Sequence, residues 1–144
     1  MTQERKLLQL IKQQIDVEGE HVKSINELRK KVGNAAARLL LLEMRLDSEK
    51  HVAVLTEMLE ILSRVHLETF LWDHVCEEYV DETLVKREFE EHVKKENSVI
   101  AQLKDEVKHT KDEGLKLLFQ NLEEDETEHK RLLETMVKNL YRID

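Results

Sequence analysis

The sequence contains no proline and only three glycines among its 144 residues. Proline breaks helices and interior glycine weakens them, so their scarcity allows long uninterrupted helices. Leucine, glutamate and lysine dominate instead, and charged residues make up 38% of the chain. This composition predicts an all-α protein, and the length predicts one domain, residues 1–144, with a substantial core.

Cysteine is equally scarce, since Cys76 is the only one. A disulfide within the chain and a Cys-x-x-Cys pair are therefore excluded. We expect Cys76 to serve packing rather than redox chemistry, because no local feature indicates a lowered pKa for its thiol.

Positive charge is also in deficit, with a net charge of −8 and no large basic face. This argues against a nucleic-acid partner, because binding phosphates requires such a face. No apolar run approaches the roughly 20 residues of a membrane span, and the first residues lack the apolar segment of a signal peptide. We therefore expect a soluble, cytoplasmic protein without a membrane partner.

What the sequence does contain is apolar residues at steps of three and four, the spacing of one face of a helix. Four such stretches run from about Gln3 to Lys31, from about Ala35 to Arg64, from near Asp81 to about Lys108, and from about Leu115 to Leu140. Residues 65–80 lose this period, which predicts a long crossover between the second and third helices.

Turn signals separate the helices. Gly33 suits a left-handed helix end, and Asn34 suits the N-cap of the next helix. Asp81 and Thr83 are both candidates for the cap of the third helix. Two short turns and one long crossover predict an antiparallel four-helix bundle with ferritin-like connections.

Polar residues interrupt each apolar stripe at one place. The interruptions are Glu18 in the first helix, Ser48 and His51 in the second, Glu96 in the third, and Glu126 and His129 in the fourth. A shift of 78 residues relates the two halves, since it carries Glu18 onto Glu96 and His51 onto His129. Antiparallel neighbours joined by short turns place these interruptions at one level of the bundle.

A single histidine on an apolar stripe is most often a hydrogen-bonded core residue. A carboxylate and an imidazole directed at a core are costly to bury unless they are paired, either in a hydrogen-bond network or on a metal ion. Several such residues at one level favour the metal. Di-iron carboxylate sites use one glutamate from each of two helices and a Glu-x-x-His motif from each of the other two.

With these residues, the chain resembles the ferritin-like superfamily, and in length and spacing it is most similar to the rubrerythrins. The resemblance covers about residues 8–141. It implies a bundle that binds two irons and oxidises Fe(II) with hydrogen peroxide or dioxygen. The metal ligands that it implies are Glu18, His51, Glu96, Glu126 and His129, with no catalytic residue separate from them.

The chain departs from the rubrerythrin pattern in three ways. Ser48 stands where the second bridging glutamate is expected, and Asp47, one residue earlier, could supply a substitute ligand. Val99 replaces a further glutamate that rubrerythrins often have, and His21, at the equivalent place on the first helix, could supply a nitrogen ligand instead. The rubredoxin-like tail is absent, so electrons would come from an external donor such as a rubredoxin.

Two alternatives stay open at this stage. One is a non-catalytic bundle that serves as an interaction module, and the other is a Zn- or Mn-binding protein without redox chemistry. With Ser48 in place, a site with one metal instead of two is also open. We expect a homodimer, for which the apolar run Leu39 to Leu42 offers a surface.

Overall fold

The computed structural model describes residues 2–64, 70–73 and 81–140, and all regular structure in them is helical. The helices are α1 (Gln3–Lys31), α2 (Ala35–Arg64), α3 (Glu82–Lys108) and α4 (Glu113–Leu140), with a short 3-10 turn, η1, at Leu71–Asp73. The all-α prediction is confirmed, and the predicted helix bounds agree with those observed to within two residues.

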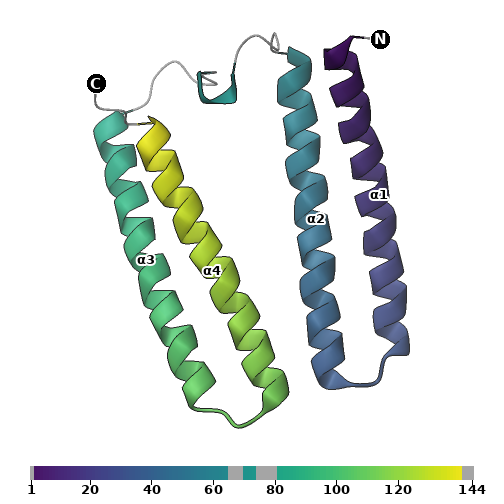
Figure 1. The fold of residues 1–144 in the computed structure, drawn as a ribbon, viewed down its shortest axis with the longest axis vertical. Helices are drawn as coiled ribbons and strands as arrows, with labels where there is room; N and C mark the ends of the chain where they lie inside the picture. Colours follow the sequence, from purple (N-terminus) through teal and green to yellow (C-terminus); the bar gives the residue numbers. More distant parts are fainter. Residues whose placement is uncertain (1, 65–69, 74–80, 141–144) are drawn as a thin grey trace. The chain divides into compact units, whose positions relative to one another are not determined.

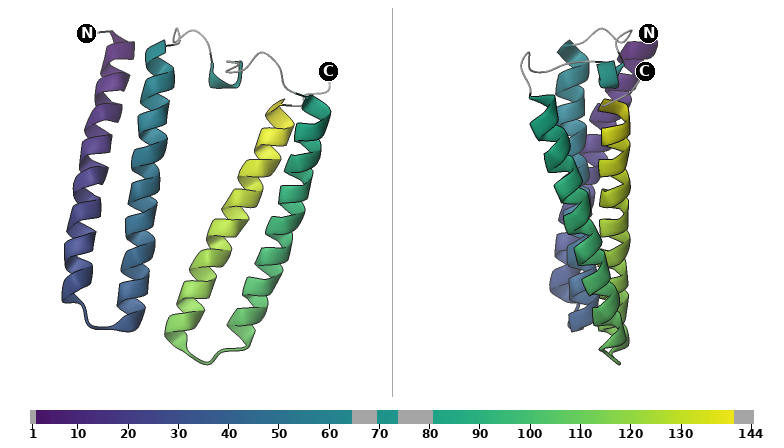
Figure 2. Two further views of the ribbon diagram at one scale, coloured as in Figure 1. Left: turned by 180° about the vertical axis from the view of Figure 1, so that it is seen from behind. Right: turned by 90° about the vertical axis from the view of Figure 1, so that its left-hand side faces the viewer.

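The helices pack as two antiparallel hairpins (Figure 1). α1 packs against α2, and α3 packs against α4. Figure 2 shows the same pairing from two further sides. The chain divides into two compact units, Met1–Phe70 and Leu71–Asp144, each of which contains one hairpin. This order of elements is consistent with a four-helix bundle that has a crossover between α2 and α3.

The predicted crossover lies mainly outside the described residues, which include only η1 and Phe70 from it. Cys76, His66 and His74 also lie outside them. None of the helices in the described ranges combines the length and the hydropathy that a membrane span requires.

Side chains cap the helices where the sequence predicts. The Asn34 carboxamide oxygen accepts from the Ala37 backbone N–H at 3.0 Å, and the Asp81 carboxylate accepts from that of Leu84 at 3.2 Å. Asp81, rather than Thr83, is therefore the cap of α3. Each cap satisfies a first-turn N–H that has no partner within the helix.

The expected left-handed conformation at Gly33 is wrong. No described glycine has a positive φ. Instead, α1 ends at Val32 in an extended conformation, with its backbone N–H donating to the Arg29 carbonyl. Because an extended residue already turns the chain away from the helix, the turn does not require the freedom of a glycine at this position.

Each hairpin buries a narrow apolar row between its two helices. In the first hairpin Ile11, Ile25 and Leu55 are buried, and in the second Leu103 is buried. Ile25 and Leu103 are related by the 78-residue shift. A two-helix hairpin covers only one stripe of each helix, so other large apolar side chains stay exposed. They include Leu7, Leu10 and Val54 in the first hairpin and Leu115, Leu117 and Leu132 in the second.

Candidate metal centre

The second hairpin brings three potential metal ligands together. Glu96 comes from the middle of α3, and Glu126 and His129 come from successive turns of α4. One ligand atom from each lies within 4.8 Å of the other two. The His129 Nδ1 atom is 3.6 Å from Glu126 Oε2. Because residues three apart on a helix share a face, α4 directs both of its ligands toward α3.

Glu96 is the member of this cluster whose pKa its neighbours shift. A hydrogen bond with Glu126, burial, and the negative charge of Glu126 together raise the pKa of Glu96 above its ordinary value, and His129 opposes the shift. Two carboxyl groups this close favour sharing one proton over being ionised together. The second oxygen of Glu96, Oε2, is buried and has no hydrogen-bond partner among the described residues.

These features fit a metal ion. A buried carboxylate oxygen without a partner is costly, and a cation would satisfy it. Three donors on one ion, each about 2.1 Å from it, lie roughly 3.4–3.6 Å apart, so donors that are up to 4.8 Å apart need to close by about 1.2–1.4 Å at most. Two carboxylates and one imidazole suit Fe, Mn or Zn. Glu96, Glu126 and His129 therefore form a candidate metal site.

The equivalent positions of the first hairpin are arranged differently. His51 Nδ1 lies 3.4 Å from Glu18 Oε1 across the two helices. His21 Nδ1 lies 3.2 Å from the hydroxyl oxygen of Ser48. Ser48 is the most buried polar residue described, at 4% exposure. These four side chains are thus paired with one another, and no group of three potential ligands in the described part of this hairpin meets the distances of a metal site.

Asp47, the suggested substitute for the missing glutamate, faces a different neighbour. Its carboxylate is 3.7 Å from the ammonium of Lys50, and the side chain is about half exposed.

Glu128 on α4 also lies outside the cluster. It is hydrogen-bonded to Arg131 through both of its oxygens, and this interaction lowers the pKa of Glu128. Glu128 therefore belongs to the solvated face, as its position in the sequence predicts.

The sequence pattern located the Glu96, Glu126 and His129 cluster but did not anticipate the bond between His21 and Ser48. One signal for it was available. In an antiparallel pair in which residue 18 faces residue 51, residue 21 faces residue 48, because one helix advances as the other returns. The sequence pattern indicates His21 as a substitute metal ligand, and this register also makes it a hydrogen-bond partner for Ser48.

Comparison of the chain with protein-family models, with curated proteins and with solved structures finds no match in any of the three.

Proposed function

We propose that this chain is a metal-binding protein whose primary site consists of Glu96, Glu126 and His129. The observation that carries the proposal is the convergence of their three donor atoms within 4.8 Å of one another, beside the buried Oε2 of Glu96, which has no hydrogen-bond partner among the described residues. His129 is half exposed at its side chain. Water can therefore reach the site and occupy coordination positions that the protein does not fill, as in metal sites that exchange small ligands.

The more specific proposal is a rubrerythrin-like protein of the di-iron type, in which Glu18 and His51 provide ligands for a second iron. It is supported by the 78-residue relation between the two hairpins and by the matching positions of the polar interruptions. Bound iron would supply the electrons for reducing hydrogen peroxide or would itself be the substrate as Fe(II). The residues of the chain would hold the ions and, through Glu96 and Glu126, accept or release a proton.

A redox-inert Zn or Mn site is the second candidate. It is favoured by Ser48, which removes a carboxylate from the position where a second bridging ligand is needed. A single ion bound by two oxygens and one nitrogen satisfies all three donors of the second hairpin. In that case the side-chain pairs of the first hairpin, Glu18 with His51 and His21 with Ser48, stay as they are and bind no metal.

Metal content per chain distinguishes these functions. We would load the metal-free chain with Fe(II) under anaerobic conditions, and separately with Zn and Mn, and count bound ions by elemental analysis. His129→Ala should remove the primary ion. His51→Ala, at the equivalent position of the first hairpin, is the matched control: it should leave a single-ion site intact but reduce the content of a two-ion site.

Ser48→Glu would then supply the missing carboxylate and should raise the number of bound ions. About two irons in the unaltered chain, with peroxide consumed when an electron donor is added, would support the di-iron function. One ion that is lost only with His129 would support the single-metal function. No bound ion under any of these conditions would contradict both and leave a non-catalytic interaction module.

A further inference from the structure

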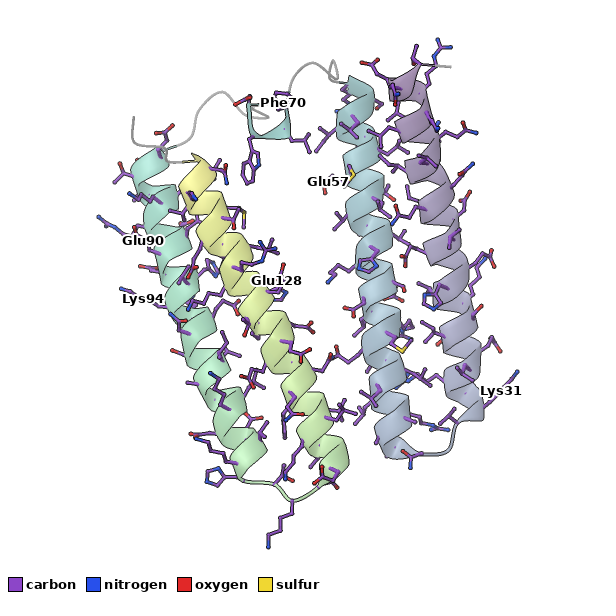
Figure 3. All side chains as sticks on the ribbon, in the orientation of Figure 1. Lys31, Glu57, Phe70, Glu90, Lys94 and Glu128 are labelled. Carbon is purple, nitrogen blue, oxygen red and sulfur yellow. The ribbon has the colours of Figure 1, made fainter. Side chains whose placement is uncertain are left out.

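A basic hollow lies at the turn end of the first hairpin. Asn26, Arg29 and Lys30 of α1 and Arg38 of α2 line it, and its volume is about 350 Å³. Residues 28–42 contain four basic and no acidic residues, in a chain whose net charge is −8. Lys31, the one basic residue of this segment outside the lining, projects from the same end of α1 (Figure 3). Positive charge is therefore concentrated here on an otherwise acidic protein.

The backbone of the turn holds both arginines in place. Arg29 Nε donates to the Arg38 carbonyl at 3.1 Å, and Arg38 Nε donates to the Val32 carbonyl at 2.5 Å. These bonds use only the Nε–H groups, and neither guanidinium has a carboxylate partner among the described residues. Because two long side chains are already ordered, a ligand that binds their terminal nitrogens loses less conformational entropy in doing so.

The other two lining residues also present donors. Asn26 has an amide nitrogen as a potential donor, and its side-chain oxygen accepts from Arg45 Nη1 at 3.4 Å. Lys30 is 3.2 Å from Glu27, but both side chains are 65% exposed. An ion pair this exposed contributes little, so a ligand can take the ammonium from it. The hollow therefore offers N–H donors and positive charge, and no carboxylate is among its lining residues.

We propose that this basic hollow binds a small, soluble, phosphate-bearing anion, such as inorganic phosphate or a diphosphate group. Two guanidinium groups match the oxygens of a phosphate through paired, charge-assisted hydrogen bonds. The volume accommodates a phosphate or diphosphate group with its water. The primary metal ligands lie on α3 and α4, and neither Glu18 nor His51, the ligands proposed for a second iron, lines the hollow. The phosphate site is therefore independent of the metal-binding function.

The second hairpin provides an internal control. Its turn region, residues 106–120, has basic residues in equal number with acidic ones. Lys108 ends α3 and Lys111 lies in the turn after it, where Asp112 and Glu113 follow Lys111 directly. Neutralising Lys108 and Lys111 thus removes the same amount of charge from the chain without touching the hollow.

The test is calorimetric titration of the full, metal-free chain, kept in chelator, with inorganic phosphate and with pyrophosphate at fixed ionic strength. We expect saturable binding of one anion per chain. The double variant Arg29→Gln/Arg38→Gln should weaken it by at least about tenfold, since charged hydrogen bonds contribute about 1.5–3 kcal/mol and each 1.4 kcal/mol is a factor of ten. Lys108→Gln/Lys111→Gln should leave it unchanged.

A second variant distinguishes the loss of anion contacts from local unfolding of the turn. Arg29→Lys/Arg38→Lys keeps both charges but removes the planar pairs of donors, and it should also weaken binding while circular dichroism stays unchanged. The proposal is overturned if neither anion binds saturably, if both pairs of neutralised residues weaken binding equally, or if the lysine variant binds as well as the unaltered chain. Binding confined to phosphatidic-acid vesicles, with none to pyrophosphate, would likewise overturn it in favour of a lipid headgroup.

Discussion

At the scale of single residues, positions 48 and 126 decide how the two hairpins differ. Glu126 shares a hydrogen bond with Glu96 and raises its pKa. Ser48 carries no charge and bonds to His21 instead, while Glu18 turns to His51. A carboxylate at this position therefore repels the carboxylate of Glu96, and binding of a proton or a cation relieves the repulsion. A hydroxyl at the equivalent position carries no charge and is hydrogen-bonded to His21.

This conflict predicts that metal binding depends on pH. The pKa of Glu96 is raised in the folded chain, so its protonated form stabilises the metal-free protein at low pH, and this stabilisation is lost as the pH rises through the raised pKa. A metal ion needs the ionised carboxylate and must displace the proton. Below the raised pKa, Mn(II) affinity should fall by about tenfold per pH unit for each proton released.

Calorimetry in buffers of different ionisation enthalpy counts the released protons directly. Glu96→Gln should bind Mn(II) at least about tenfold more weakly and release one proton fewer in the acid range. Glu18→Gln, the equivalent change in the first hairpin, is the control. If Glu96→Gln and the unaltered chain release the same number of protons, Glu96 does not carry the proton that the metal displaces.

At the scale of elements, each hairpin is one copy of a repeated unit. α2, the second helix of the first hairpin, begins at Ala35. α4, the second helix of the second hairpin, begins 78 residues later, at Glu113. The repeat also preserves the buried position shared by Ile25 and Leu103. It does not preserve Gly19, which lies inside α1, whereas α3 has no glycine.

Substitution of Gly19 tests whether another surface packs closely against α1 at this residue. An added Cβ would meet no atom within 4 Å among the described residues, and φ is not positive there. Gly19→Ala should therefore stabilise the chain by about 0.5–1 kcal/mol, because alanine favours the helix more than glycine does. Urea denaturation measures the change.

The reverse substitution on α3, Ala101→Gly, is the matched control and should destabilise by about the same amount. A loss of stability in Gly19→Ala would contradict the prediction. It would indicate that another surface, from this chain or from a second copy, contacts α1 closely at residue 19.

At the scale of the whole molecule, the apolar surface of each hairpin requires a partner that covers it. Each leaves large apolar side chains exposed when taken by itself, and a four-helix bundle is the arrangement that commonly covers such stripes. We also retain the proposal of a homodimer. Leu39, in the suggested dimer surface Leu39–Leu42, is 44% exposed.

A bundle predicts that both hairpins unfold together. Ile25 and Leu103 are buried to similar degrees, at 6% exposure or less, and each change to alanine should cost about 2–4 kcal/mol. In a bundle, Ile25→Ala and Leu103→Ala should each shift one common denaturation transition, followed by circular dichroism and by Trp72 fluorescence. Two transitions, each shifted by only one of the variants, would contradict the bundle and indicate independent hairpins.

The sequence by itself determined the helix bounds to within two residues, the cap at Asn34, and the positions at which polar residues interrupt the apolar stripes. For α3 it narrowed the cap to Asp81 or Thr83, and the structure selected Asp81. These features follow from local rules, because capping and periodicity act within a few residues of one helix.

Tertiary structure alone decided the pairings: Glu18 with His51, His21 with Ser48, and Glu96 with Glu126. It also replaced the left-handed glycine expected at Gly33 with an extended Val32, and it ordered Arg29 and Arg38 into the basic hollow. The reason is physical. Which side chains meet across two helices depends on their register and rotamers, and the energy of a carboxylate or a guanidinium depends on the partner that it finds there.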